Sequence, residues 1–414
     1  MFDIKNYDIY TAFISFIIAF SLLFFLFRKK SIGVIDPLTY HLLWISGNIA
    51  FLIAYIEKYG LAYISVLFFL IFIIYTSIIL YLIKPVHIKY TLSISSEKNK
   101  KGKIFFLYIV SIIILLYSKK PVFDFLLNNN IIAWFLYRYK AIEGGQAFYR
   151  ILDLGITPIF LYLSFYILCI VKKYKLFTTI TLFLYLFLLI LTGGRSSFLA
   201  LIFSFGGFIA FHRESFLTIK KQKKINRIGK YLILFALMIA MFVSAMFEQT
   251  YSAEAGINTI LNRVIATADG LEYYMKYNGF DKIHSGAYEY FMSIFSVYTK
   301  SYIDISYKNI GHQLSELATG VKLDFAQGSN YTLPLQVMVF NYLLMPIYVL
   351  VISLVVVKMR NVQNLTPYKI NILGFFMLSS SFGIVTDIEF FVLRTMSFLV
   401  IYFLIFYPIL KIKI

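Results

Sequence analysis

Residues 9–27 read IYTAFISFIIAFSLLFFLF, an apolar run without a charged side chain. A helix rises about 1.5 Å per residue, so such a run nearly crosses the roughly 30 Å hydrocarbon core of a bilayer. Similar runs recur along the 414 residues, of which 60% are hydrophobic and only 14% charged. This composition excludes a water-soluble fold and predicts an all-α integral membrane protein. The length of the runs also excludes an outer-membrane β-barrel, whose strands are about ten residues long.

The hydropathy pattern predicts about eleven transmembrane helices in a single polytopic membrane domain, residues 1–414. The expected spans are Ile9–Phe27, Leu38–Ile56, Leu61–Ile83, Ile104–Tyr117, Leu154–Val171, Leu176–Leu191, Ser197–Phe211, Tyr231–Phe247, Leu333–Val357, Ile370–Val385 and Phe390–Leu410. The runs that begin at Ile104 and Ser197 are short for a span.

Basic residues are divided unevenly between the two sets of loops. Loops 28–37, 84–103, 172–175, 212–230 and 358–369, with the C-terminal tail, carry 24 of the 39 Lys and Arg residues but three of the 20 acidic residues. Because basic loops stay in the cytoplasm, we expect the N-terminus outside and the C-terminus inside. The same rule accounts for the net charge of +19, so no nucleic acid partner is expected.

Two loops on the expected outer side, 118–153 and 248–332, are too long to be simple connectors. In the second loop, apolar residues recur at helical spacing from Ile257 to Met275, which predicts an amphipathic helix. An aromatic segment follows at 287–298. A third short helix is expected at Asn309–Ala318, ended by Gly320. Loops of this length usually carry function, so we expect the active residues here.

The tight outer turn Thr192–Phe198, TGGRSSF, is the most conspicuous polar motif. Its glycines permit close approach of the backbone, and the guanidinium of Arg195 suits phosphate. The next helix would begin here, with the positive end of its dipole facing outward. The motif therefore predicts an anion site, although a plain helical hairpin with a snorkelling arginine has the same pattern.

Further cations lie in the two long outer loops. Arg138, Lys140 and Arg150 flank a Gly-Gly-Gln sequence, and Arg263 lies next to the apolar Val264. They suit a polyanionic headgroup, or they are simply solvated charges.

Titratable and hydrogen-bonding residues gather in three places. His312 and Glu316 are four residues apart and share a helix face, as an oriented general base would require, or as an ordinary capping histidine would. The sequence QGSNYTLP, Gln327–Pro334, offers hydrogen-bonding groups just before a span. Asp387, Glu389 and Arg394 cluster at the outer end of the last hairpin and predict either an ion pair or a substrate site.

The sequence predicts neither a metal site nor a cofactor. It has no GxxxxGK[ST] nucleotide motif, no HExxH zinc motif and a single cysteine, Cys169, which excludes an intramolecular disulfide.

These features together resemble the bacterial Wzy-type O-antigen or capsular repeat-unit polymerases. The resemblance covers the architecture of most of the chain, but only short motifs are specific. The best is TGGRSSFLA at 192–200; GHQLSELATG at 311–320 and GSNYTLPLQVMVFNY at 328–342 are similar to the end of the family's second periplasmic loop. The chain departs from the family at Gln336, where many relatives have an acidic residue nearby, and in lacking glycines near Leu343–Met345.

The resemblance implies a glycosyltransferase of the bacterial cytoplasmic membrane. It would join undecaprenyl-diphosphate-linked oligosaccharides, as donor and acceptor, on the outer face and would need no nucleotide sugar. Such chemistry calls for cations on the leaving diphosphate, a base for the acceptor hydroxyl and groups that hold sugars. The cation expected on the diphosphate is Arg195, helped by Arg263, Arg150 and Arg394, with Arg138 and Lys140. The expected base is His312, with Glu316 or Glu272 as alternatives. The residues expected to hold sugars are Tyr288, Gln327, Asn330 and Tyr331.

Two alternatives remain open. An O-antigen ligase has similar architecture, and a lipid-linked oligosaccharide flippase or other transporter belongs to a different class. A transporter should show inverted repeats and broken helices at mid-membrane, and the sequence displays neither. Membrane lipid, a chain-length regulator and a flippase are further partners compatible with the polymerase interpretation.

Overall fold

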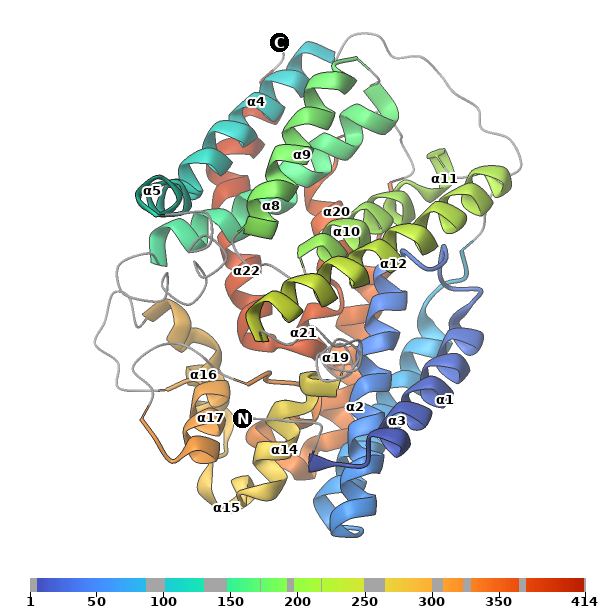
Figure 1. Ribbon diagram of the computed structural model, residues 1–414, viewed down its shortest axis with the longest axis vertical. Helices are drawn as coiled ribbons and strands as arrows, with labels where there is room; N and C mark the ends of the chain where they lie inside the picture. Colours follow the sequence, from blue (N-terminus) through green and yellow to red (C-terminus); the bar gives the residue numbers. More distant parts are fainter. Residues whose placement is uncertain are drawn as a thin grey trace. The chain divides into compact units, whose positions relative to one another are not determined.

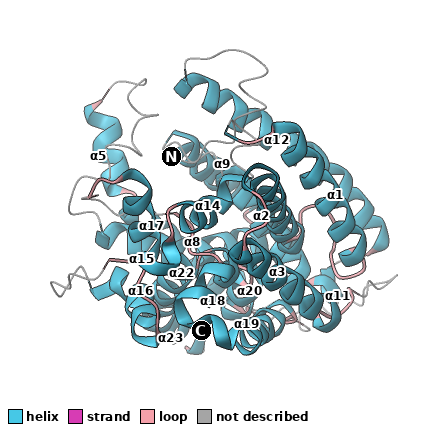
Figure 2. Ribbon diagram, turned by 90° about the horizontal axis from the view of Figure 1, so that it is seen from below, coloured by secondary structure: helices cyan, strands magenta, loops and turns pink. Residues whose placement is uncertain are grey.

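The computed structural model describes residues 6–86, 101–129, 147–171, 173–191, 197–216, 218–248, 265–299, 308–322, 329–364 and 370–412. These residues are almost entirely helical and contain no β-strand, as the ribbons of Figures 1 and 2 show. The prediction of an all-α membrane protein is therefore confirmed at the level of fold class.

The chain forms two compact units, each assembled from separate stretches of sequence. The first comprises Met1–Val86, Ser244–Asn361 and Ser380–Val392, and the second His87–Val243, Val362–Ser379 and Leu393–Ile414. Helices of the first unit are α1 (Ile9–Phe27), α2 (Pro37–Tyr59), α3 (Tyr63–Leu82), η3 (Ala266–Ala268), α14 (Asp269–Lys276), α15 (Gly279–Lys282), α16 (Ala287–Thr299), α17 (Ile310–Thr319), α18 (Leu333–Asn341), η4 (Tyr342–Leu344), α19 (Met345–Arg360) and α21 (Gly383–Thr386).

Helices of the second unit are α4 (Lys101–Ser118), α5 (Lys120–Asn128), α8 (Ala147–Tyr166), η2 (Ile167–Val171), α9 (Lys175–Leu191), α10 (Ser197–Phe211), α11 (Arg213–Phe216), η5 (Tyr402–Phe406) and α23 (Tyr407–Lys411). Three helices have residues in both units: α12 (Ile219–Glu248), α20 (Ile372–Ser380) and α22 (Ile388–Ile401).

Helices occupy all eleven ranges in which a span was expected. Within the described part of the chain, six are long and apolar enough to cross a membrane: Ile9–Phe27, Pro37–Tyr59, Tyr63–Leu82, Phe148–Val171, Leu333–Arg360 and Ile388–Lys411. A seventh candidate is the pair Gly102–Ser118 and Lys120–Asn128, bent by 52°. Shorter apolar helices lie at Lys175–Leu189, Leu199–Phe211 and Ile372–Thr386.

The first two helices begin at aspartate caps. Asp8 accepts hydrogen bonds from the backbone N–H groups of Tyr10 and Thr11, and Asp36 accepts one from Leu38 just after Pro37. These caps satisfy amide groups that a helix leaves unpaired at its N-terminus. The two helices differ in burial: 17% of the apolar window of α1 is buried inside the protein, against 72% for α2. Helix α2 is therefore a central helix of the first unit, whereas α1 keeps most of its surface for lipid.

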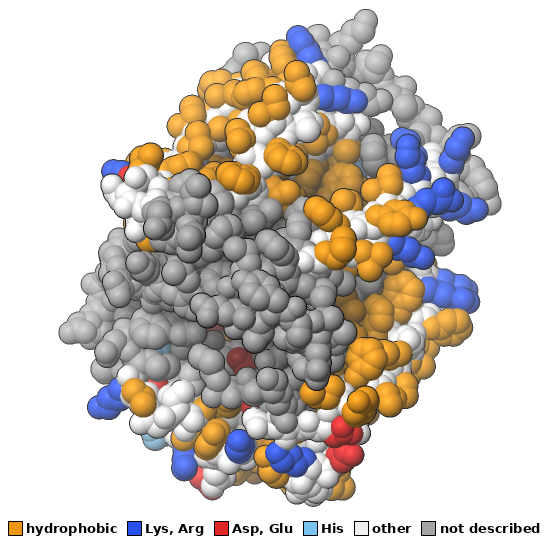
Figure 3. Space-filling view, viewed as in Figure 1, with side chains coloured by type: hydrophobic (Ala, Val, Ile, Leu, Met, Phe, Trp, Pro, Cys, Tyr) orange, Lys and Arg blue, Asp and Glu red, His pale blue; other side chains and the backbone are white. Residues whose placement is uncertain are grey.

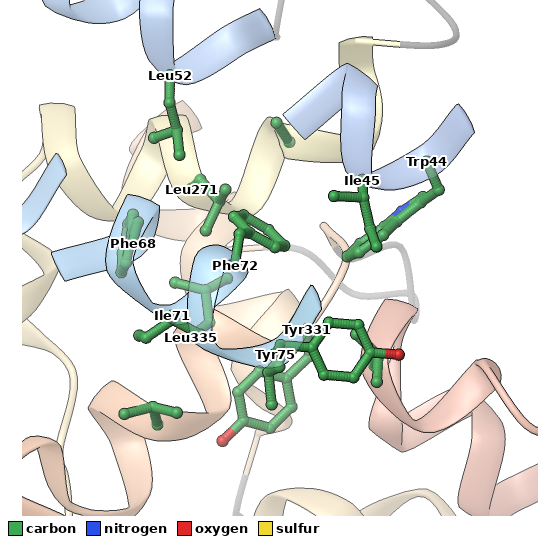
Figure 4. Packing of buried hydrophobic residues seen from close by; sticks show 14 of the residues in the cluster. Trp44, Ile45, Leu52, Phe68, Ile71, Phe72, Tyr75, Leu271, Tyr331 and Leu335 are labelled. Atoms are coloured by element: carbon green, nitrogen blue, oxygen red, sulfur yellow. The ribbon is translucent and has the colours of Figure 1, made fainter. Parts of the chain in front are cut away.

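The core of the first unit combines membrane helices with the segment that follows residue 264. Figure 4 shows Trp44 and Ile45 of α2, Phe72 of α3, Leu271 of α14 and Leu335 of α18 among its side chains. The segment expected as an outer loop thus contributes to the same core as the membrane helices, which fixes its short helices on them.

One buried ion pair joins two membrane helices of this unit. A guanidinium nitrogen of Arg360, at the end of α19, lies 2.7 Å from Oδ2 of Asp36, and the two side chains are 1% and 0% exposed. The same arginine nitrogen donates to the carbonyl oxygen of Lys30, while Asp36 also accepts from the N–H of Ile32. We call Asp36 and Arg360 the α2–α19 clamp.

The second unit packs largely through aromatic rings and small residues. Tyr108 of α4 stacks on Phe160 of α8 with ring centres 5.7 Å apart, and Phe376 stacks on Phe398 at 3.9 Å. A Cβ atom added at Gly155 would lie 2.4 Å from the carbonyl oxygen of Ser397, so this approach of α8 to α22 requires glycine.

The bend between α4 and α5 carries an ion pair. Lys119 lies between the two helices, and its ammonium contacts Oδ2 of Asp153 on α8 at 2.7 Å. Asp153 thereby compensates the charge of Lys119, which lies in the expected outer loop 118–153.

Candidate functional site

The segment Ser329–Thr332, which precedes α18, is held between α14 and α17. The N–H of Ser329 donates to the carbonyl oxygen of Gly311 at 3.1 Å and to Oγ of Ser315 at 3.1 Å, both on α17. The next residue, Asn330, donates its backbone N–H to Oδ1 of Asp269 at 3.1 Å, at the start of α14. Two short helices from distant parts of the sequence therefore fix the backbone of one segment.

Two glycines allow this close approach. A Cβ atom added at Gly311 would lie 2.3 Å from the carbonyl oxygen of Ser329, and one at Gly270 would lie 2.6 Å from that of Asn330. Neither contact leaves room for a side chain, because the opposing atoms belong to backbone.

Asp269 is a half-buried carboxylate at the centre of this arrangement. Its Oδ1 accepts hydrogen bonds from the N–H of Gly270 at 2.7 Å and from both the backbone and the side-chain amide of Asn330. Burial raises the pKa of Asp269 to about 6, against the lowering effect of these hydrogen bonds and with a further rise from the charge of Asp387. A carboxyl group with such a pKa exchanges protons near neutral pH.

Two more carboxyl groups lie at the start of α22, with Asp387 directly before the helix and Glu389 in its first turn. Asp387 accepts a hydrogen bond from the N–H of Phe390 at 3.0 Å, and burial raises the pKa of Asp387 to about 6. Glu389 is 7% exposed, and its Oε1 accepts from the N–H of Ile310, the first residue of α17, at 2.9 Å. This hydrogen bond satisfies one of the amide groups that α17 leaves unpaired at its N-terminus. These groups place three acidic residues in the first unit around the N-terminal ends of α14 and α17.

Helix α17 and the residue Lys308 just before it carry three polar side chains that lead from the surface inward. Nε2 of His312 lies 3.1 Å from Oε1 of Glu316, and the ammonium of Lys308 contacts both carboxylate oxygens of Glu316 at 2.5 and 2.7 Å. The exposed fractions of the three side chains, Lys308, Glu316 and His312, fall in the order 36%, 19% and 4%. We call these residues the α17 triad. The geometry brings together the predicted pair of His312 and Glu316 and adds Lys308.

Caps at both ends of α17 define the helix that holds His312 and Glu316 on one face. Asn309 accepts from the N–H of His312 at 3.0 Å, and Gly320 ends the helix in the left-handed region at φ 69°. These are the residues from which the sequence predicted a helix here. In the imidazole tautomer whose proton is on Nε2, that nitrogen donates to Glu316 and the lone pair of Nδ1 is left to act as a base.

Gln336 on α18 lies in a buried hydrogen-bond network. Its amide nitrogen donates to the carbonyl oxygens of Tyr331 and Ile384, and its amide oxygen accepts from the hydroxyl of Tyr348. The hydroxyl of Tyr348 also contacts that of Tyr290. Gln336 therefore orders the core behind Ser329–Thr332, a structural role.

Glu272, an alternative base in the sequence interpretation, is engaged elsewhere. Its Oε1 accepts from the hydroxyl of Tyr7 at 2.7 Å, and burial raises the pKa of Glu272. Tyr7 in turn packs against Phe51 and Tyr55 of α2. Glu272 thereby ties the segment before α1 to α14, which makes it a poorer candidate than His312.

The residues predicted to hold sugars differ in exposure. Tyr331 is 0% exposed, so the structure corrects its assignment: the ring belongs to the core and offers no face to a sugar. Asn330 is half-buried and bound to Asp269, whereas Tyr288 on α16 is 67% exposed and its ring is open to stacking.

The structure describes only two of the predicted cations, Arg150 and Arg394. Arg150 is exposed on α8. Arg394 belongs to the second unit, where its guanidinium carbon lies 6.0 Å from the centre of the Phe376 ring, whereas Asp387 and Glu389 belong to the first. Arg195, Arg138, Lys140, Arg263 and Gln327 lie outside the described residues. The first part of the amphipathic helix expected from Ile257 also lies outside them, while its later apolar positions Ala268 and Leu271 are buried and Met275 is half-buried against the core.

Asp269 is the functional candidate that sequence reasoning missed. Its only local signal is an Asp-Gly pair at a helix start, which is common. The contact with Asn330, 61 residues later, has no local pattern.

No group of three or more His, Cys, Asp or Glu residues within the described ranges could hold a metal ion. Comparison with known proteins gives no match: neither a protein-family model, nor a curated protein, nor a solved structure is similar to this chain.

Proposed function

We propose that this protein is a membrane glycosyltransferase of the Wzy type, which joins undecaprenyl-diphosphate-linked repeat units into O-antigen or capsular polysaccharide. In this proposal the eleven apolar helices all span the bacterial cytoplasmic membrane, with the N-terminus outside, and residues 248–332 lie on the outer face. The α17 triad is the observation that carries the proposal, because it supplies a nearly buried, oriented imidazole in a segment between membrane spans.

The proposed reaction needs a base for the acceptor hydroxyl. His312 takes the proton at Nδ1 while Glu316 holds Nε2–H and stabilises the imidazolium that forms. Lys308 contacts both carboxylate oxygens of Glu316 and holds it in this orientation. Asp269 and Asp387, with pKa values of about 6, are suited to receive or return a proton near neutral pH.

The donor's diphosphate leaves with a growing negative charge, which a guanidinium stabilises in the transition state. Arg195 is proposed for this role on its sequence motif, with Arg150, Arg263 and Arg394 as helpers. Exposed Tyr288 is proposed to stack on a sugar ring.

Deletion of the gene tests this function directly. A polymerase deletion should leave surface lipid that carries a single repeat unit, because export and ligation continue. Polymer retained on undecaprenyl diphosphate would identify a ligase instead, and loss of all surface repeats would identify a flippase.

The flippase alternative gains one supporting observation, the 52° bend between Gly102–Ser118 and Lys120–Asn128. A break of this kind is typical of a broken span or a re-entrant segment, as transporters have. In a reconstituted vesicle assay, a flippase would move lipid-linked oligosaccharide across the bilayer without lengthening it, whereas a polymerase would lengthen it.

A further inference from the structure

The N-terminal part of α12 carries a dense group of cations. Residues 219–230 read IKKQKKINRIGK, with six basic residues and no acidic one. All six basic side chains are exposed. Figure 3 shows blue side chains gathered over this part of the helix. Such a sequence satisfies the positive-inside rule however the charges are distributed around the helix.

The charges are in fact distributed on one side. At about 100° per residue, Lys220, Lys223, Lys224, Arg227 and Lys230 fall within an arc of about 120° and extend along about 15 Å of the helix. We call these five residues the α12 stripe. Orientation of the membrane protein does not require this arrangement, but contact with a charged plane does.

The opposite side of the same helical segment is turned toward protein. Gln222 and Asn226 are half-buried and Gly229 is buried, about half a turn away from the stripe. The helix is therefore anchored by one face and presents the other. Lys221 lies outside the arc, between the two faces.

The stripe continues directly into an apolar sequence. From Tyr231 the same helix reads YLILFALMIAMFVSAMF to Phe247, about 26 Å at 1.5 Å per residue. This is the length of a membrane-inserted segment, so the cations next to it lie at the level of the headgroups. Lysine and arginine side chains extend far enough to reach phosphates there.

We infer that the α12 stripe binds the headgroups of anionic phospholipids in the leaflet that it faces. Charge complementarity and direct continuity with a bilayer-length apolar sequence favour a lipid surface over an acidic protein or a nucleic acid. The inference is independent of the proposed polymerase activity, since any polytopic protein with this helix would have the same surface.

The test compares two full-length variants that lose the same charge on the same predicted side. The stripe variant carries Lys223→Gln, Lys224→Gln and Arg227→Gln; the control carries Lys89→Gln, Lys98→Gln and Lys100→Gln, between α3 and α4. Each purified protein is titrated with phosphatidylglycerol and with phosphatidylcholine in a neutral detergent, and lipid adducts are counted by native mass spectrometry.

The wild-type protein should bind phosphatidylglycerol at lower concentration than phosphatidylcholine. Each cation contributes about fivefold to the affinity for phosphatidylglycerol, so the stripe variant, which lacks three, should bind this lipid roughly a hundredfold more weakly. The affinity of the control should change little. Equal weakening in both variants would overturn the inference in favour of a general charge effect. A wild-type protein without preference for phosphatidylglycerol would overturn it in favour of another acidic partner.

Discussion

The first unit contains two charged clusters with opposite characters. The α2–α19 clamp is sealed from solvent, with a guanidinium and a carboxylate that are 1% and 0% exposed. In the α17 triad the exposure of the side chains decreases from the partly exposed Lys308 to the nearly buried His312. The fully buried clamp has no route for proton exchange with a substrate and serves to join helices. The α17 triad instead connects a buried imidazole with the surface. Burial, more than residue type, separates the structural role from the chemical one.

The clamp should show its role most clearly when one partner is removed. Arg360→Met leaves the Asp36 carboxylate buried without its counter-ion, which costs about 3–5 kcal/mol of unfolding free energy. Denaturation of the purified protein in detergent measures this loss. Lys358→Met, an exposed lysine on the same helix, is the matched control and should change stability little. Equal losses in the two variants would show that the clamp contributes no more than a surface charge.

The triad should instead affect activity. His312→Gln removes the proposed base while keeping a polar side chain, and polymerisation should fall by roughly 10²–10⁴-fold with little change in the melting temperature. Chain length of the surface glycan and turnover in reconstituted vesicles are the measurements. Thr319→Ala, at the exposed end of the same helix, serves as the control. Normal polymer made by the His312→Gln variant would exclude His312 as the base.

Asp269 predicts a pH dependence with a definite sign. Its native pKa of about 6 exceeds the ordinary value of 3.8, so the folded protein binds this proton more tightly than the unfolded chain does. The contribution of Asp269 to stability therefore rises as pH falls from 7 through 6 toward 4, by at most about 3 kcal/mol. Asp387 adds to the same window.

Asp269→Asn keeps the oxygen that Asn330 and Gly270 contact but removes the titration. Melting temperatures measured between pH 7.5 and 5 should rise less steeply on acidification in this variant than in the wild-type protein. Identical slopes would mean that Asp269 does not titrate in this range.

Lys308→Gln is expected to have the smallest effect. Lys308 is partly exposed, and exposed ion pairs contribute only about 0–1 kcal/mol, so turnover should fall by a few fold at most. The difference in turnover between the variant and the wild-type protein should shrink at high salt, because salt screens the Lys308–Glu316 pair that only the wild-type protein has. Lys322→Gln, exposed just beyond the helix, is the control; an unchanged difference at high salt would contradict an electrostatic role.

Local sequence signals predicted the helices well. Helix α1 has the bounds that its apolar run indicated, and α17 lies between the cap residues Asn309 and Gly320 that predicted it. These features depend on periodicity and capping, which act within a few residues. The pairing of His312 with Glu316 was predictable for the same reason, since residues four apart share a helix face.

Contacts between distant residues were not predictable in this way. Arg360 and Asp36 are 324 residues apart, and Glu272 and Tyr7 are 265 apart. Tyr331 was expected at a substrate surface because its neighbours are polar. The close approach of Ser329 to Gly311 fixes this segment, and its tyrosine lies in the core. Only the packing of separate segments determines such positions.

The separation of the clamp residues also has a consequence in time. At about 5–20 residues per second of synthesis, Arg360 leaves the ribosome about 16–65 seconds after Asp36, because 324 residues lie between them. During that interval helix α2 is already made but its counter-ion is not. The nascent protein must therefore keep a carboxylate at the end of an apolar helix accessible to water until the second half of the first unit arrives. Release from the insertion machinery before that moment would expose this half-built unit to degradation.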